Sequence, residues 1–194
     1  MNEVLNIIHL EDYDNFPHRK IRKESFLKQI EEQGIKEYKI WEGIYIEDNP
    51  IKAISQSHKK IVLDAKEKGL ERVIVAEDDF LFTSKNSWSF FINSIPKDGY
   101  DIFLSHLYHG EWNEKGKVLG PFAALTLYSV HQRFYDIFLN KPEDEHLDLV
   151  MNKAWRNEIK VCLPMVCKQM GGYSDNEKKE MNWEFKEINK PFLK

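Results

Sequence analysis

Three adjacent acids are the part of this sequence best suited to chemistry: Glu77, Asp78 and Asp79. They follow residues 73–76, a short β-branched run typical of a central strand buried on both faces, and ligands bind at the carboxyl ends of such strands. Adjacent carboxylates repel one another and resist desolvation, so a bound Mg²⁺ or Mn²⁺ is the simplest compensation. Because side chains alternate along a strand, we predict that Glu77 and Asp79 hold the ion. The alternative is an acidic turn that caps the next helix or pairs with Lys85.

Two histidines and a tryptophan are further candidates in one later segment. His106 and His109 form an H-x-x-H pair with Glu111 nearby, but loop histidines are commoner than zinc sites. We therefore expect them to contact an acceptor or to donate a third ligand to the same ion. Trp112 lies in the polar segment 111–117, which is predicted to form a mobile flap with the indole stacked on a sugar. A tryptophan in a loop is as often packed against its own domain.

The elements that must position these residues alternate between strand and helix. Strands are predicted over residues 4–10, 38–44, 73–76, 100–104, 121–128 and 160–166, and helices over 19–33, 50–68, 86–95, 130–139 and 147–155. This alternation predicts an α/β fold with a mostly parallel, Rossmann-like sheet. No glycine-rich dinucleotide or P-loop motif occurs, so a metal must take over the binding of any phosphates.

Length and composition narrow the possibilities further. A chain of 194 residues suits one domain over residues 1–194, with residues 171–194 as a tail that docks on it. Gln169 and Asp175 flank a Gly171–Gly172 hinge that is predicted to let this segment close over a ligand; the alternative is an exposed turn. The net charge of −4, with both signs interspersed, excludes a basic nucleic-acid surface. No leader or membrane span is evident, so a cytoplasmic protein is expected.

Short blocks along nearly the whole chain resemble glycosyltransferase family 25, the lipopolysaccharide-type glycosyltransferases of GT-A fold. The most specific block is Gln56-Ser57-His58, then a helix, then an apolar strand that ends in Glu77-Asp78-Asp79. The other blocks keep the family's order: Ile8-His9-Leu10 with Arg19 and Arg22, Tyr100-Asp101-Ile102, residues 125–130, Leu147-Asp148, and Pro164, Gln169 and Ser174-Asp175.

The resemblance implies a single-domain GT-A fold, a Rossmann-like three-layer sandwich. It also implies a metal-dependent enzyme that moves a sugar, with inversion, from a nucleotide-sugar donor to an acceptor. We expect a UDP-sugar as donor and a glycan or a lipopolysaccharide-type glycolipid as acceptor, which leaves peripheral association with a membrane possible. Two alternatives remain: a catalytically silent saccharide- or nucleotide-binding domain, and a sugar-nucleotide nucleotidyltransferase. The second alternative needs a basic, glycine-rich first loop, which this sequence lacks.

The resemblance also suggests a role for each site residue. Glu77-Asp78-Asp79 looks like the E-x-D variant of the metal-binding D-x-D motif, with Glu77 and Asp79 as metal ligands and Asp78 at the donor. Ser57 and His58 would contact the donor's nucleotide or phosphates, although a solvated serine and a satisfied core histidine would look the same in the sequence. Asp148 would be the catalytic base, although a helix dipole also favours an acid in a first turn.

Overall fold

A computed structural model describes residues 3–153 and 156–181. Its centre is one six-stranded sheet, in the order β2 (Tyr38–Glu42), β1 (Leu5–His9), β3 (Arg72–Glu77), β6 (Leu127–His131), β5 (Ile102–Leu104) and β7 (Ile159–Val161). Five of these strands run in the same direction, and β6 runs antiparallel to its neighbours β3 and β5. The predicted α/β fold with a mostly parallel sheet is therefore confirmed.

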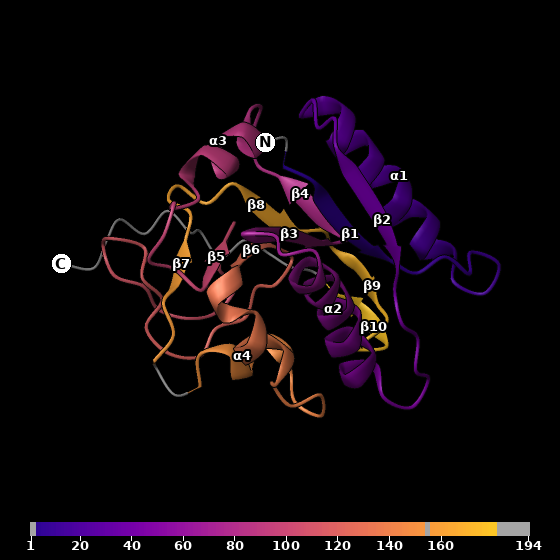
Figure 1. The fold of residues 1–194 in the computed structure, drawn as a ribbon. Coiled ribbons are helices and arrows are strands. Elements are labelled where there is room, and N and C mark those ends of the chain that lie inside the picture. Colours follow the sequence, from indigo (N-terminus) through magenta and orange to yellow (C-terminus); the bar gives the residue numbers. More distant parts are fainter. Residues whose placement is uncertain (1–2, 154–155, 182–194) are drawn as a thin grey trace.

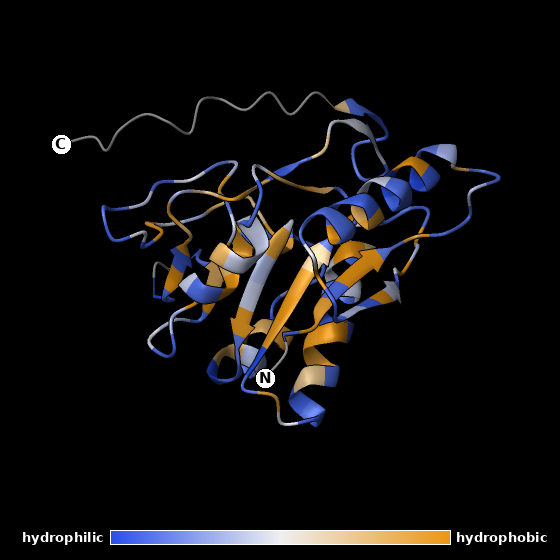
Figure 2. Cartoon of the chain, turned by 90° about the horizontal axis from the view of Figure 1, so that it is seen from above, coloured by the Kyte–Doolittle hydropathy of each residue, from blue (hydrophilic) through white to orange (hydrophobic). Residues whose placement is uncertain are grey.

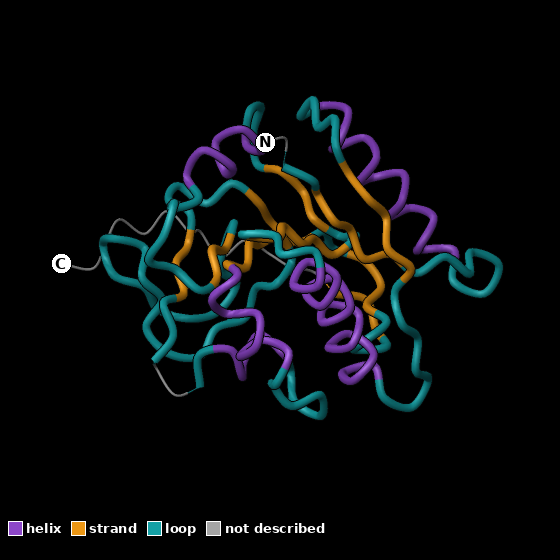
Figure 3. The backbone as a smooth tube through the Cα atoms, in the orientation of Figure 1, coloured by secondary structure: helices purple, strands orange, loops and turns teal. Residues whose placement is uncertain are grey.

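Helices cover both faces of the sheet and make three layers (Figures 1 and 3). One face carries α1 (Pro17–Glu32) and α3 (Ser87–Ser94). The opposite face carries α2 (Pro50–Glu67), α4 (Tyr135–Leu139) with the short 3-10 helix η1 (Gln132–Phe134), and α5 (Leu147–Met151). The sheet thus separates two hydrophobic cores.

Strand β3 belongs to both cores because its side chains alternate. Val73 and Val75 pack into the core beneath α2, whereas Ile74 and Ala76 pack into the core beneath α1. Figure 2 shows the central strands as hydrophobic and the outer helix faces as hydrophilic. A strand buried on both faces ends at Glu77, so the acids come where the apolar run leaves the sheet.

The boundaries of α2 follow from the local sequence. The side chain of Asn49 caps the helix by accepting a hydrogen bond from the Lys52 N–H at 3.0 Å, and Pro50 occupies the first helical position. Gly69, with a φ of 64°, terminates it in the left-handed conformation. Ser57 and His58 lie between these ends, on the buried face of α2.

Four predicted elements have bounds that differ clearly from the structure. The strand expected over residues 160–166 ends at Val161, and the helix expected over residues 147–155 ends at Met151. The other two meet at β6. The strand expected over residues 121–128 begins only at Leu127, and it continues to His131, so the helix expected from residue 130 starts later, at Gln132. The reason is tertiary: β6 is hydrogen-bonded on both sides, to β3 and to β5, and that pairing carries the extended backbone past Val130. Residues 121–126, which were expected to belong to this strand, take part in one isolated bridge, between Ala123 and His109.

Two small sheets were not predicted. Strands β4 (Phe80–Phe82) and β8 (Cys167–Gln169) pair antiparallel directly beyond the acids. Strands β9 (Gly172–Ser174) and β10 (Lys179–Met181) form a hairpin from the first part of the predicted tail. Residues 182–194 of that tail lie outside the described residues. Within the described residues, no helix combines the length and the apolar character needed to cross a bilayer.

Candidate active site

A cavity of about 530 Å³ opens where β1 and β3 end. It brings together residues that are far apart in the sequence, and all the predicted site residues line it: Ser57, His58, Glu77, Asp78, Asp79 and Asp148. Gln169 and Asp175 line it as well. The structure therefore brings these side chains together at one edge of the sheet, and each acid is held there in a different way.

Glu77, the last residue of β3, lies against α2. Its Oε1 is 3.2 Å from Nε2 of His58, whose Nδ1 lies 2.6 Å from the hydroxyl of Tyr128. Both His58 and Tyr128 are buried. The carboxylate of Glu77 is therefore oriented by the imidazole of His58, which is held in turn by the hydroxyl of Tyr128.

Asp78 points to the other face of the sheet, as strand alternation predicts. Its two oxygens are engaged by Nδ1 of His9 at 2.7 Å and by Nη1 of Arg22 at 3.0 Å. Nη2 of Arg22 donates to the carbonyl oxygen of Tyr173 in β9, and the guanidinium thereby ties the middle acid to the hairpin. Asp78 is thus paired with a cation, although the partner is Arg22 of α1 and not the nearby Lys85 considered above.

Asp79 is buried, and its two oxygens differ. Oδ2 accepts a hydrogen bond from Nε2 of Gln169 at 2.8 Å, while Oδ1 has no hydrogen-bond partner among the described residues. Arg22 approaches Oδ2 only to 3.9 Å. Burial, followed by the charge of Glu77, raises the pKa of Asp79 to about 7. This carboxyl is the least well compensated of the three.

The cavity as a whole carries an excess of negative charge. Six carboxylates line it: Glu77, Asp78, Asp79, Asp148, Asp175 and Glu177. Among its described lining residues, Arg22 is the one lysine or arginine, and Asp78 already engages it. An unpartnered oxygen on Asp79 and this charge excess both fit a bound cation. Within the described residues, however, no three His, Cys, Asp or Glu side chains are grouped to enclose an ion by themselves.

Asp148 lies in the first turn of α5 on the wall of the same cavity. Its Oδ1 accepts a hydrogen bond from the backbone N–H of Leu149 at 2.8 Å. Burial raises the pKa of Asp148 against the effect of that hydrogen bond, and the charge of Glu77 adds to the rise. This position is consistent with both explanations of Asp148: an acid favoured by the helix dipole and an acid that faces a substrate.

Ser57 has its hydroxyl committed to the protein. Its Oγ accepts from the backbone N–H of Ile44 at 2.8 Å and donates to the carbonyl oxygen of Ala53 at 2.8 Å. The serine thereby fixes the segment that follows β2 against α2. Ser57, His58 and Asp78 all line the cavity, but their polar atoms already form hydrogen bonds within the protein. Contact of these residues with a donor therefore stays a prediction.

His106, His109 and Trp112, the further candidates from the sequence, do not come together at one site. His106 is buried, its Nε2 has no hydrogen-bond partner within residues 3–153 and 156–181, and burial lowers its pKa to about 4. His109, in contrast, is exposed on the rim of the cavity. Trp112 pairs with Val118 in an isolated bridge and packs against the core beneath α2. The structure thus shows Trp112 packed on its own domain, the alternative to a sugar-stacking position.

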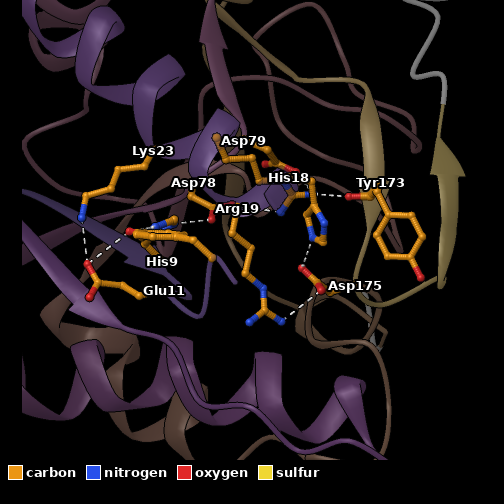
Figure 4. Close-up of polar contacts among 11 residues, drawn as sticks. His9, Glu11, His18, Arg19, Lys23, Asp78, Asp79, Tyr173 and Asp175 are labelled. Atoms are coloured by element: carbon orange, nitrogen blue, oxygen red, sulfur yellow. Dashed lines mark hydrogen bonds and ion pairs between the residues drawn. The ribbon is translucent and has the colours of Figure 1, made fainter. Parts of the chain in front are cut away.

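The β9–β10 hairpin closes one side of the cavity and is attached to α1 by charges (Figure 4). Asp175 accepts from Nη2 of Arg19 and pairs with Nε2 of His18, each at 3.1 Å. Burial acts to raise the pKa of Asp175, but the hydrogen bonds from Arg19 and His18 outweigh it and hold the pKa below its ordinary value. Asp175 is therefore tied to α1 and is not an exposed turn residue.

Solved structures share this fold, although no family model matches the chain and no curated protein matches its sequence. A197 from STIV aligns with a TM-score of 0.55 at 11% identity over 93% of each chain. A glycosyltransferase involved in the glycosylation of the major capsid of PBCV-1 aligns with a TM-score of 0.54 at 13% identity, over 92% of this chain and 97% of that one. UTP-bound UGPase from Acinetobacter baumannii aligns with a TM-score of 0.50 at 13% identity, over 84% and 86%.

These identities are low enough that the likeness shows the fold alone. The fold implied by the resemblance to glycosyltransferase family 25 is thereby confirmed. Membership of that family stays a prediction.

Proposed function

We propose that this protein is a divalent-metal-dependent glycosyltransferase that moves a sugar from a nucleotide-sugar donor, a UDP-sugar in the first instance, to a saccharide acceptor. The observation that carries the proposal is the cavity at the sheet edge, where the buried and half-satisfied Asp79 lies beside Glu77 and shares the lining with Asp148. The acceptor class that we propose is a glycan or a lipopolysaccharide-type glycolipid, on the resemblance to family 25.

Glu77 and Asp79 are the residues that would hold Mn²⁺ or Mg²⁺. A cavity lined by six carboxylates and one arginine repels a diphosphate, so an anionic donor needs a cation there. When bound, such an ion neutralises charge on the diphosphate leaving group. Since no three His, Cys, Asp or Glu side chains in the described part of the chain enclose an ion by themselves, oxygens of the donor or of water would complete its shell.

The proposed site of the nucleoside is a smaller hollow next to the main cavity. This hollow of about 160 Å³ shares Leu10, Ile44 and Asp175 with the main cavity and has Phe16 and Tyr45 among its walls. We place the nucleoside there and the diphosphate next to Glu77 and Asp79. Ser57 fixes the backbone of Ile44 between the two hollows, which gives this serine a role in shaping the donor site.

Asp148 is the proposed base. An acceptor hydroxyl must lose its proton as the sugar is transferred, and a carboxylate with a raised pKa is better suited to take it than an ordinary aspartate. Direct transfer onto an acceptor activated by one base inverts the anomeric centre. Comparing the anomeric configurations of donor and product by NMR tests that outcome.

The test uses water as the acceptor, because slow hydrolysis of the donor needs no knowledge of the natural one. UDP-, GDP- and CMP-sugars are incubated with and without Mn²⁺, and release of the nucleotide is measured. Asp148→Asn should lower the rate by about 10²–10⁴-fold and leave the affinity for the nucleotide unchanged. Asp144→Asn is the matched control, because this exposed acid lies in the preceding loop and outside the cavity lining.

A parallel assay with nucleoside triphosphates and sugar 1-phosphates, in which release of pyrophosphate is measured, separates the alternatives. A sugar-nucleotide nucleotidyltransferase would release pyrophosphate from a nucleoside triphosphate and a sugar 1-phosphate. A silent binding domain would turn over neither substrate pair. Either result, or rates that do not depend on Mn²⁺, would contradict the proposed function.

A further inference from the structure

We propose that Tyr128 and His58 are positioning residues, which orient the carboxylate of Glu77 through a neutral imidazole so that the full charge of Glu77 is left for a cation. This inference rests on the proposed function, because it concerns the same ion. It gives His58 a different task from contact with the donor, and it gives Tyr128 a task that the sequence does not suggest.

The three side chains form a continuous chain of hydrogen bonds from the sheet to the cavity. Tyr128 of β6 is fully buried, and its hydroxyl lies 2.6 Å from Nδ1 of His58. His58 of α2 is 1% exposed, and its Nε2 lies 3.2 Å from Oε1 of Glu77. The two rings stack with centroids 5.7 Å apart and planes inclined by 28°, which restrains the rotation of the imidazole.

The protons of this chain can be assigned from both ends. An ionised carboxylate only accepts hydrogen bonds, so Nε2 of His58 must carry a proton and donate it to Glu77. At the other end, burial holds the pKa of Tyr128 well above its ordinary value, so the phenol keeps its proton. If that phenol accepted from Nδ1, its own proton would be buried without a partner, and this is costly. The phenol therefore donates to Nδ1, and His58 is the neutral Nε2–H tautomer.

A neutral donor has a consequence that a charged one does not. At Asp78, the guanidinium of Arg22 at 3.0 Å neutralises the carboxylate and leaves little charge for an ion. At Glu77, the imidazole fixes the direction of the carboxylate without cancelling its charge. Tyr128 supports this geometry, because an O–H directed at Nδ1 leaves the proton on Nε2, where it faces Glu77.

The first test reads the tautomer directly. Two-bond ¹H–¹⁵N NMR of the ¹⁵N-labelled full chain distinguishes a protonated Nε2 from a protonated Nδ1. The expected result is the Nε2–H tautomer for His58 in the absence of any ligand. Observation of the Nδ1–H tautomer would overturn the inference, and this readout does not depend on what the protein catalyses.

The second test measures the binding of Mn²⁺ alone, by electron paramagnetic resonance. His58→Leu removes the donor to Glu77 and should weaken binding by about 10–100-fold, while Tyr128→Phe, which deletes one hydroxyl, should weaken it by about tenfold. His58→Gln keeps an N–H that can reach the carboxylate and should restore most of the affinity. Tyr100→Phe is the control, since it also deletes a buried hydroxyl, bonded to Ser129 at 3.2 Å outside the cavity lining, and should leave Mn²⁺ binding unchanged.

The outcomes are distinct. If Tyr128→Phe and His58→Leu are folded by circular dichroism and bind Mn²⁺ as tightly as the wild type, the positioning role is refuted. If the wild type binds no Mn²⁺, the proposed function loses its cation and the positioning role falls with it, even where the Nε2–H tautomer is found. If the wild type binds Mn²⁺, His58→Leu and Tyr128→Phe bind it more weakly and His58→Gln recovers most of the affinity, the inference stands.

Discussion

Replacing Asp79 by asparagine should make the protein more stable at pH 8 and change the way its stability depends on pH. The pKa of Asp79 is raised from 3.8 to about 7, first by burial and then by the charge of Glu77. A folded-state pKa above the unfolded one means that the folded chain binds more protons between pH 4 and pH 7, so its stability falls as the pH rises through this interval. Asparagine has no proton to lose, and its amide oxygen can still accept from Gln169.

The magnitude follows from the size of the pKa shift. Each pKa unit corresponds to 1.36 kcal/mol. The raised pKa of Asp79 therefore lowers the free energy of unfolding by about 4 kcal/mol at pH 8 and by less than half of that at pH 5. The stability difference between Asp79→Asn and the wild type should therefore grow by about 2–3 kcal/mol between these pH values. For a domain of this length, that corresponds to roughly 4–12 °C in Tm.

The assay is urea denaturation of both proteins at pH 5 and pH 8, followed by fluorescence. Asp175→Asn is the matched control, because ion pairs lower the pKa of Asp175 and their stabilisation is present above pH 4. That variant should be less stable than the wild type at both pH values, by an amount that does not grow between them. Mn²⁺ added at pH 8 should stabilise the wild type, by about 2.7 kcal/mol at 100 times its Kd, and should stabilise Asp79→Asn much less.

An Asp79→Asn protein that is less stable than the wild type at pH 8, or that exceeds it equally at both pH values, would refute the reasoning. Either result would mean that the carboxylate is well compensated in the folded state. The buried and unpartnered Oδ1 would then be no argument for a cation.

Three further substitutions test how the site is held in place. Arg22→Met removes the cation from Asp78 and should cost about 3 kcal/mol of the free energy of unfolding, because a buried charge loses its partner; urea denaturation at pH 7 measures it. Asn6→Ala should cost about 2–3 kcal/mol in the same assay, since the side chain accepts from the indole of Trp41 and donates to two carbonyl oxygens. Gly116→Ala should lower the Tm, because φ is 74° and a Cβ would lie 2.6 Å from a carbonyl oxygen of β7.

The sheet edge and its acids could be predicted from the sequence because local signals agree there. An uninterrupted β-branched run ends abruptly in Glu77, and the helix before it is bounded by Asn49 and Gly69. The start of β6 could not be predicted in this way. Residues 121–131 are apolar enough for strand or helix at either end, and only pairing with β3 and β5 decides where the extended backbone begins and ends.

The partners of the acids were beyond sequence reasoning for a different reason. Asp78 meets a histidine 69 residues earlier, Asp79 meets a glutamine 90 residues later, and His58 meets a tyrosine 70 residues later. Such pairs depend on the register of strands that are distant in the sequence. Tyr128 in particular looks like a core aromatic of a strand, and only its position behind His58 shows that the hydroxyl has a task.

The contrast among the three acids explains how a strand can end in so much negative charge and remain folded. Asp78 is neutralised by Arg22, which leaves two carboxylates for the protein to support. Glu77 is oriented by a neutral ring and is partly open to solvent, so its charge costs the fold little. Asp79 is buried with one neutral donor, and the cost of its charge appears as the raised pKa. A second arginine beside Asp79 would remove that cost, and it would also remove the place for an ion.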